Sequence, residues 1–398
     1  MAPMIVMIVN VGSTSLKFRV LDMDGEREMA SGKIDRIGAA GKSVFACKTS
    51  KRSFQRELGT IDYAQAVKTM LDDLTDEDHG VLKLEHIRAI GFKTVHARGI
   101  SDTTILDDDA IARMEDYVSV APAHNPPYLK AIRIFRELLP ETPLVGVFEA
   151  HFHKTIPLHL GAYALPLEFY EQGLRKYGFH GASHHFISER VGQILPSARR
   201  VISCHLGGSS SLCAILDGES LDTSMGFSPQ SGMPQGTRCG DIDSYVMIHL
   251  MKDKGYSLES VEKLFGEQAG LLGMSGVSAE MSDILAVAAA GNASARIAID
   301  VYCASIKKYI GAYAALLGGV DAVVFTGGIG ENAADIRRRV LEGLEFLGVE
   351  LDEKANQAPP GERLISLGKC RVYVIPANEE IIVARETVRA LASRMPAR

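Results

Sequence analysis

Cysteine is scarce in this chain, and long apolar runs are missing. The six cysteines are scattered among 398 residues, and no C-x-x-C pair occurs, so a disulfide framework is not expected. No apolar run reaches the roughly 18 residues that span a bilayer. The apolar N-terminal stretch lacks the basic leader of a signal peptide, and we expect it to be a strand. These absences predict a cytoplasmic protein with reduced thiols and no membrane partner.

An excess of positive charge is also missing. The formal net charge is −6, which does not supply the basic surface that nucleic acid binding requires. Local positive groups must therefore meet any anionic substrate. The composition is otherwise that of a globular protein, with 46% hydrophobic and 23% charged residues. A chain of this length is too long for one compact core, which favours two domains.

A strand, turn and strand pattern occurs twice. Residues 4–22 and 201–218 both contain two strands joined by a turn rich in glycine and serine, and both continue to an Asp-Gly pair. Glycine lets successive N–H groups point at one place, and hydroxyls add donors, so each turn suits a phosphate. The repeat predicts a duplicated domain with a nucleotide in the cleft between the copies.

Strands alternate with helices along the rest of the chain, which predicts an α/β fold with largely buried sheets. The domains are expected at 1–149 plus 380–398, and at 150–379. Residues 242–317 are helix-rich. We expect further helices at 60–80, 109–118, 128–139, 333–347 and 380–394, and strands at 87–96, 143–149, 320–326 and 371–375.

Two glycine-bearing segments place polar groups where phosphate would bind. In an extended segment, Ser13, Ser15 and Lys17 share one face, so two hydroxyls and an ammonium would point into one cleft. The alternative is a solvated hairpin tip. Residues 327–332, GGIGEN, follow a strand and precede a helix. A strand, a glycine turn and a helix together place phosphate or ribose at the helix N-terminus.

Arg238 lies in the segment GTRCGDID, between two glycines. An arginine in such a loop is a candidate to neutralise a transferring phosphoryl group. The alternative is a structural ion pair with Asp241 or Asp243.

Histidine and glutamate supply the remaining candidates. His180 and His184 have the i, i+4 spacing of a zinc-binding helix, but Gly181 is a poor helix residue and no glutamate follows His180. We therefore favour His180 as a hydrogen-bond donor to phosphate. Glu149 at a strand end and Glu379 in the segment PANEE are candidates for Mg²⁺ or base chemistry. The alternative for Glu379 is capping of a helix.

Together these segments resemble a known family. The motifs of acetate kinases occur in order over nearly the whole chain, as NVGSTSLKF, APAHNPP, KYGFHGASHHFISERV, DTSMGFSPQSG, GTRCGDID, GLLGMSG, FTGGIGENAADIRRRVLEGLEFLGV and IPANEE. The resemblance implies two duplicated actin-like (ribonuclease H-like) domains, and reversible transfer of the γ-phosphoryl group of ATP to acetate or a related short-chain carboxylate. It also implies Mg²⁺ as cofactor, an acyl phosphate as product, and a homodimer that contacts through the second domain.

The resemblance assigns site residues by motif position. The catalytic residues would be Lys93, Arg98, Glu149, His180 and Arg238. The carboxylate substrate would meet Val95, His124 and Pro229. Phosphate would meet Ser13 and Ser15, and the metal would be held by Asn10 and Glu379. The nucleotide would contact Lys17, His205, Gly207, Gly208, Glu280, Met281, Ser282, Gly327, Gly328, Ile329, Gly330 and Asn332.

Four places differ from the family pattern. Lys93 stands where the family has arginine, Glu149 where it has aspartate, and Gly208 where it has asparagine. Near the adenosine base, residues 280–282 lack an arginine. Lysine has no planar fork and glutamate is one methylene longer than aspartate, so the acyl and adenosine sites are expected to be altered. Two other functions remain open at this point: a nucleotide-binding regulator without catalysis, and a metallohydrolase built on the histidines.

Overall fold

The computed structural model describes residues 3–122 and 124–393, which form an α/β chain of two compact units. Unit 1 combines the chain up to His151 with the segment that begins at Asn378, and unit 2 is Phe152–Ala377. The last residue of the helix predicted at 380–394 lies outside the described residues.

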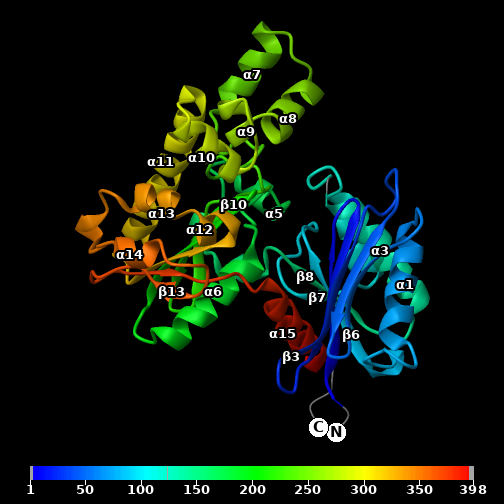
Figure 1. Cartoon of the computed structure of the whole chain (residues 1–398). Coiled ribbons are helices and arrows are strands. Elements are labelled where there is room, and N and C mark those ends of the chain that lie inside the picture. The colour runs from blue at the N-terminus through cyan, green and yellow to red at the C-terminus, as the bar shows by residue number, and fades with distance from the viewer. Residues whose placement is uncertain (1–2, 123, 394–398) are drawn as a thin grey trace. The chain divides into compact units, whose positions relative to one another are not determined.

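Unit 1 is built on an eight-stranded sheet in the order β5-β4-β3-β2-β1-β6-β8-β7. Helices α1 and α3 lie on one side of this sheet and α15 on the other (Figure 1). The strands are β1 Ile5–Val11, β2 Ser15–Asp22, β3 Arg27–Asp35, β4 Val44–Thr49, β5 Ser53–Glu57, β6 Ile87–Thr94, β7 Thr104–Ile105 and β8 Leu144–Phe148. The helices are α1 Tyr63–Thr75, α2 Asp108–Asp116, α3 Asn125–Leu138 and α15 Glu379–Ala392.

Unit 2 is built on a six-stranded sheet in the order β11-β10-β9-β12-β14-β13. The strands are β9 Arg200–Leu206, β10 Ser210–Leu216, β11 Glu219–Thr223, β12 Ala322–Thr326, β13 Arg363–Leu364 and β14 Arg371–Val374. The helices are α4 Leu158–Gly161, α5 Leu167–Glu171, α6 Gly181–Ile194, α7 Ser244–Asp253, α8 Leu258–Glu267, α9 Gly270–Ser275, α10 Met281–Ala289, α11 Ala293–Leu316, α12 Gly327–Asn332, α13 Ala334–Leu341 and α14 Glu353–Asn356.

Side chains of alternate residues in β9, β10 and β12 pack into two separate hydrophobic cores in unit 2. Val201 and Val324 pack with α6, whereas Ile202 and Phe325 pack with α11 and α13. This period of two is expected of strands that are buried on both faces. The central sheet is therefore covered on both sides, and polar side chains within it, such as Ser203 and Ser211, are buried.

The two sheets share one topology. The order β3-β2-β1-β6-β8 in unit 1 matches β11-β10-β9-β12-β14 in unit 2. In both, the first two pairings are antiparallel and the next two are parallel. The duplication predicted from the two hairpins is thus confirmed at the level of five strands per unit.

A backbone hydrogen bond closes the first hairpin turn. Gly12 donates its N–H to the carbonyl of Ser15 at 2.8 Å, and a Cβ on Gly12 would stand 2.6 Å from Ser15 Oγ. The turn leaves Ser15 and Lys17 on one face of β2, opposite the buried Leu16 and Phe18. Ser13 lies in the bend before the strand, so the prediction that it shares their extended face is wrong. The reason is that Ser13 belongs to the tight turn that joins β1 to β2, where the backbone is not extended.

Most predicted helices and strands are confirmed within a few residues, but the glycine segment 327–332 is not the turn that the sequence predicts. It forms the short helix α12, which follows β12 directly. The helix predicted at 333–347 is also shorter, because α13 ends at Leu341 and Gly343 adopts a φ of 79°. Side-chain contacts at both ends of α12, described below, give the reason for the first difference.

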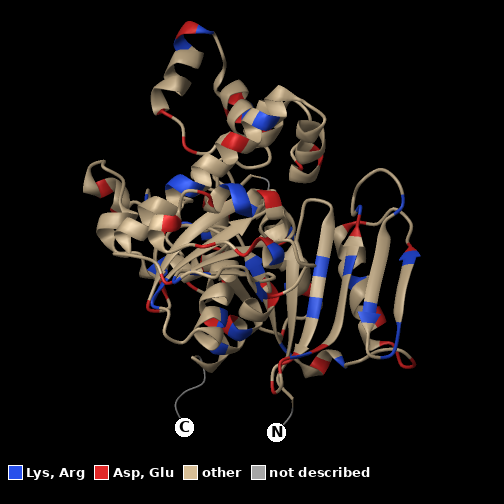
Figure 2. Ribbon diagram, turned by 60° about the vertical axis from the view of Figure 1, so that its left-hand side comes forward, with Lys and Arg blue, Asp and Glu red and all other residues tan. Residues whose placement is uncertain are grey.

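Charged residues of both signs are interspersed over the helices and strands in Figure 2. The six cysteines are free. In the part of the chain that the structure describes, no helix has the length and apolarity needed to cross a membrane. Helix α7 has no buried residue, and the α7 and α8 pair projects from the rest of unit 2 (Figure 1).

Candidate functional site

The carboxyl ends of three parallel strands gather polar groups in unit 1. Asn10 lies near the end of β1, Lys93 near the end of β6, and Glu149 directly after β8. Lys93 Nζ lies 3.0 Å from Glu149 Oε1 and also contacts Glu379, the first residue of α15. The tertiary structure thus brings together three predicted site residues that are up to 286 positions apart, counted from residue 93 to residue 379.

Burial and neighbouring charge shift the pKa of Lys93 in opposite directions. Its side chain is only 17% exposed, and that burial alone would lower the pKa of the ammonium. The carboxylates of Glu149 and Glu379 outweigh it, so the pKa is raised well above its ordinary value. Lys93 is therefore a permanent cation held between two carboxylates.

Tyr128 belongs to this cluster, and sequence reasoning missed it. Its hydroxyl donates to Asn10 Oδ1 at 3.1 Å and accepts from the N–H of Val11 at 3.2 Å. Burial raises the pKa of the phenol, which stays neutral. The signal was weak, because Tyr128 also fits the buried face of a helix, but it lies four residues after His124 in the motif-bearing segment. It fixes the orientation of the Asn10 amide.

A cavity of about 250 Å³ opens beside the first hairpin. Its lining includes Asn10, Lys17, Arg19, Lys33 and Glu380. Lys17 is exposed on β2 and pairs across the ladder with Asn10. The cavity brings two of the predicted phosphate and metal residues together with two more cations.

Three other predicted residues of unit 1 lie in the segments that follow β6 or precede α3. Val95 is half-buried just after β6, and His124 is the residue that precedes α3. Arg98 turns to the surface, where its Nε lies 2.7 Å from Asp116 Oδ2 and its side chain is 56% exposed. The structure therefore brings Lys93, and not Arg98, to the carboxylates.

Two histidines stack in unit 2. The rings of His180 and His205 have centroids 4.2 Å apart with an interplanar angle of 28°. His180 precedes α6 in the left-handed conformation, with a φ of 57°, and its Nδ1 contacts Ser211 Oγ at 2.9 Å. His205 Nδ1 contacts Ser183 Oγ at 2.8 Å. Hydroxyls on α6 and β10 thus orient both rings.

Hydrogen bonds to serine hydroxyls, and not a metal-ligand geometry, account for both ring nitrogens of His184. Both of its ring nitrogens are hydrogen-bonded, Nδ1 to Ser203 Oγ at 2.9 Å and Nε2 to Ser211 Oγ at 2.7 Å. Burial lowers its pKa well below the ordinary value. Ser211 joins His184 to His180, so the i, i+4 histidines share a hydroxyl in place of a metal. The packing of α6 against β9 and β10 decides this.

Arg238 is held by neutral oxygens. Its Nη1 donates to Ser209 Oγ at 3.2 Å, Gln235 Oε1 at 3.1 Å and the Pro229 carbonyl at 3.5 Å. Across residues 3–122 and 124–393, no carboxylate pairs with it. Burial lowers the pKa of the guanidinium. The buried Gln235, which sequence reasoning missed, also donates to Pro229, so three segments converge on this cation.

The alternative that Arg238 pairs with Asp241 or Asp243 is wrong. Asp241 accepts hydrogen bonds from the Gly232 N–H and the Tyr309 hydroxyl. Asp243 caps α7 by accepting from the N–H of Tyr245. Both carboxylates are used for local structure, which leaves the guanidinium charge without an ionic partner in the described part of the chain.

The predicted nucleotide residues of unit 2 lie around the second hairpin turn. Thr326, which precedes α12, pairs with His205, so α12 begins beside residues 207–208. Gly327 has a φ of 77°, and a Cβ on it would stand 2.7 Å from the Leu206 carbonyl. A Cβ on Gly236 would lie 3.1 Å from the Gly208 carbonyl and 3.3 Å from that of Ala279.

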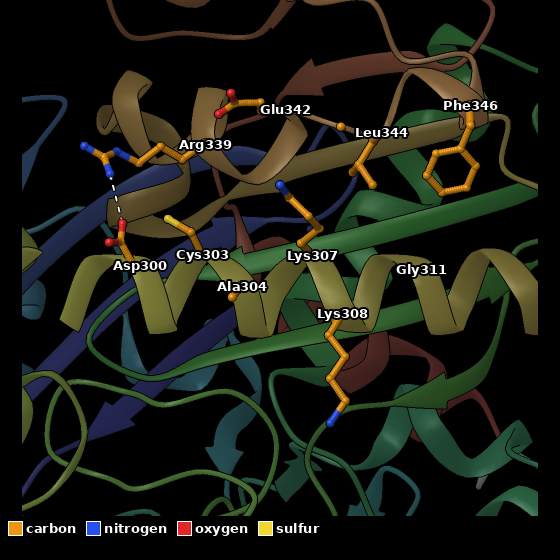
Figure 3. Close-up of a pocket in the computed structure, with 11 residues that line it drawn as sticks. Asp300, Cys303, Ala304, Lys307, Lys308, Gly311, Arg339, Glu342, Leu344 and Phe346 are labelled. Carbon is orange, nitrogen blue, oxygen red and sulfur yellow. Dashed lines mark hydrogen bonds and ion pairs between the residues drawn. The ribbon is translucent and has the colours of Figure 1, made fainter. Parts of the chain in front are cut away.

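Gly236 lies close to the carbonyls of both Gly208 and Ala279, so residues 280–282, which follow Ala279, lie near the second hairpin turn. Glu280 precedes α10, Met281 is buried and Ser282 is exposed. A further cavity of about 590 Å³ lies between α11 and the α13 region, where Asp300 pairs with Arg339 (Figure 3). None of its lining residues is a predicted site residue.

Known proteins resemble this chain over nearly its whole length. The sequence model of the Acetokinase family matches residues 5–385. An acetate kinase from Clostridium novyi is 41% identical over 390 residues, which covers 96% of this chain and 97% of that protein. The chain belongs to the acetokinase family.

Solved structures agree with this membership. The acetate kinase of Porphyromonas gingivalis has a TM-score of 0.87 at 36% identity, covering 98% of this chain and 100% of that chain. A propionate kinase from Francisella tularensis has a TM-score of 0.89 at 33% identity, covering 97% of this chain and 99% of that chain. The fold is therefore that of acetokinases, with the two sheets that the resemblance implies.

Proposed function

We propose that this acetokinase transfers the γ-phosphoryl group of ATP to acetate or a related short-chain carboxylate, reversibly, giving an acyl phosphate and ADP. The observation that carries the proposal is Arg238, a half-buried guanidinium whose hydrogen bonds within the described residues go to neutral oxygens. A half-buried cation without a carboxylate partner in the described chain is arranged to meet an anion. A phosphoryl group that gains negative charge in the transition state is such an anion.

In the proposed reaction, a substrate carboxylate oxygen attacks the γ-phosphorus in line, and the bond from that phosphorus to the ADP oxygen breaks. Such a transfer needs positioning and charge stabilisation more than covalent help. Arg238 and His180 of unit 2 would stabilise the equatorial oxygens. We assign the further positive charge to Lys93 in place of Arg98, because the Arg98 guanidinium is exposed and paired with Asp116.

We propose Mg²⁺ as the cofactor, held by Asn10 and Glu379. Carboxylate and amide oxygens are the hard ligands that Mg²⁺ prefers, and the cluster around Lys93 offers them. When bound, the ion would neutralise phosphate oxygens. Glu149 would orient the metal ligands or the substrate through Lys93, and Ser13, Ser15 and Lys17 would contact phosphate.

The remaining assignments follow the same proposal. The nucleotide would meet α12, the turn with His205, and residues 280–282, while Val95, His124 and Pro229 would line the acyl site.

We also propose a homodimer, supported by exposed apolar side chains of unit 2 such as Tyr245, Leu258 and Phe346. The free cysteines support a reducing, cytoplasmic compartment.

A hydroxamate assay for acyl phosphate tests the proposed function. ATP and Mg²⁺ are supplied with formate, acetate, propionate, butyrate and hydroxy acids in turn. Turnover on one acid is expected, and the profile shows what Lys93 and Glu149 select. If no acid is phosphorylated by protein that still binds ATP in calorimetry, the kinase proposal fails, and the result points to a nucleotide-binding regulator.

A further inference from the structure

Charged side chains hold both ends of the short helix α12. At its start, Glu331 Oε1 accepts a hydrogen bond from the N–H of Gly327 at 3.0 Å. At its end, Arg337 Nη1 donates to the carbonyls of Gly330 at 2.8 Å and Glu331 at 3.0 Å. Six residues are too few for a helix to be stable alone, so these contacts determine where α12 lies.

Arg337 makes the far end of α12 rigid. It is 1% exposed, and it also donates to Asn356, to Oδ1 at 2.8 Å and to the carbonyl at 2.6 Å. Burial lowers the pKa of this guanidinium to about 10, so it remains charged at neutral pH. The cation matches the negative end of the helix dipole and fixes it to α14. The end of α12 therefore cannot move without breaking a buried network.

The start of α12 is tied to another part of the chain. Glu331 Oε1 accepts a second hydrogen bond, from the N–H of Ala377 at 3.1 Å. Ala377 is the last residue of unit 2, and Glu379 follows it by two positions. One carboxylate oxygen thus holds the first N–H of α12 and the segment that leads to the proposed metal ligand.

We propose that Glu331 is a positioning residue that couples nucleotide binding at α12 to metal binding at Glu379. The inference rests on the proposed function, which assigns nucleotide to α12 and Mg²⁺ to Glu379. A nucleotide that packs against α12 restrains the Glu331 carboxylate, and through it the N–H of Ala377. The first ligand to bind bears the conformational entropy cost of restraining the segment before Glu379, and the second ligand does not bear it again. Each ligand therefore strengthens binding of the other.

Calorimetry of ADP binding with and without Mg²⁺ tests the coupling. In the wild type, Mg²⁺ is expected to strengthen ADP binding. Glu331→Ala is expected to reduce that enhancement at least about fivefold, the lower end of typical coupling factors. Glu331→Gln keeps an acceptor oxygen and is expected to restore most of it. Glu331→Asp keeps the charge but is too short to reach both N–H groups, so it should behave like alanine.

Glu345→Ala is the matched control, because Glu345 Oε1 accepts from the Gly343 N–H at 3.1 Å in a turn away from α12. It should leave the enhancement unchanged, and thermal melting verifies that each variant folds. A wild-type enhancement in both Glu331→Ala and Glu331→Asp would overturn the coupling alone. If the wild type bound no nucleotide, the proposed function would fall, and this inference with it.

Discussion

Two cations that are five positions apart in the sequence differ in how far their side chains are buried. Lys93 is 17% exposed between two carboxylates, whereas Arg98 is 56% exposed beside Asp116. An exposed ion pair contributes little to stability, and a buried charge persists only with partners. The cost of burying the Lys93 charge is therefore offset by Glu149 and Glu379, which marks this lysine as the cation that the fold maintains.

Lys93 and Glu149 are expected to be energetically coupled. Lys93→Arg places a larger planar group in a space that is closed at 3.0 Å by Glu149, and Glu149→Asp withdraws the carboxylate by about one C–C bond. Each single change should lower kcat about tenfold, and the double change should recover most of that loss. Steady-state kinetics on the four proteins of the cycle measure the coupling. Strictly additive losses would show that the two side chains act independently.

Arg238 is expected to act on the transition state. Arg238→Ala should lower kcat at least about 100-fold, because it removes a half-buried charged donor that has no role in an ion pair of the described chain. The melting temperature should change little, and added guanidinium should restore part of the rate. Arg190→Ala, which removes an exposed partner of Glu362, is the control. Near-native turnover of Arg238→Ala would exclude this arginine from the mechanism.

At the scale of single elements, short-range pattern determines the hairpins but not α12. In both hairpins, apolar strand residues flank a glycine turn, and the ladder forms as the pattern predicts. In the segment GGIGEN, three glycines favour a turn over a helix. The helix forms because Arg337 and the pairing of β12 with β9 supply contacts from outside the segment, and Glu331 within it accepts from the Gly327 N–H.

Gly327 is expected to be intolerant of substitution. Its φ of 77° and the 2.7 Å approach of a Cβ to the Leu206 carbonyl oppose any side chain. Gly327→Ala should lower the melting temperature by several degrees and raise the KM for ATP more than the KM for the carboxylate. Gly311→Ala in α11 has open space at its Cβ and should keep or raise the melting temperature. Equal melting temperatures for the two variants would contradict the steric argument.

At the scale of the whole molecule, unit 2 buries neutral histidines. His153 Nε2 contacts the Phe179 carbonyl at 3.0 Å and Nδ1 contacts Ser220 Oγ at 2.8 Å. Burial lowers the pKa of His153 from 6.5 to about 4. Between these values the unfolded chain binds a proton that the folded chain does not. The free energy of unfolding therefore falls as the pH drops below 6.5, and this loss ends near pH 4.

The expected loss from His153 is about 2 kcal/mol at pH 5, at about 1.4 kcal/mol per pH unit. Denaturant unfolding between pH 7.5 and pH 5 measures it. His153→Asn should flatten the dependence of stability on pH, although it lowers stability at pH 7.5. His159→Gln changes an exposed histidine and should leave the slope as in the wild type. A slope that is unchanged in His153→Asn would show that other groups control the acid response.

The sequence by itself predicted much of this protein. Strand and helix periodicity gave the α/β class, the duplicated hairpins gave the repeated topology, and the ordered motifs gave the family. These features depend on neighbours in the chain, where side-chain period and glycine conformation act directly. The outlines of both hairpins, and the residues at their tips, follow from local rules.

Only the tertiary structure decided which polar groups meet. Lys93 and Glu379 come from distant segments, and their contact depends on how α15 packs against β6, where a Cβ on Gly91 would strike Thr387. The same holds for Ser211 between His180 and His184, and for Tyr128 on Asn10. Contacts between distant residues are set by packing and burial, because sheet register and helix docking, and not sequence spacing, fix the distances.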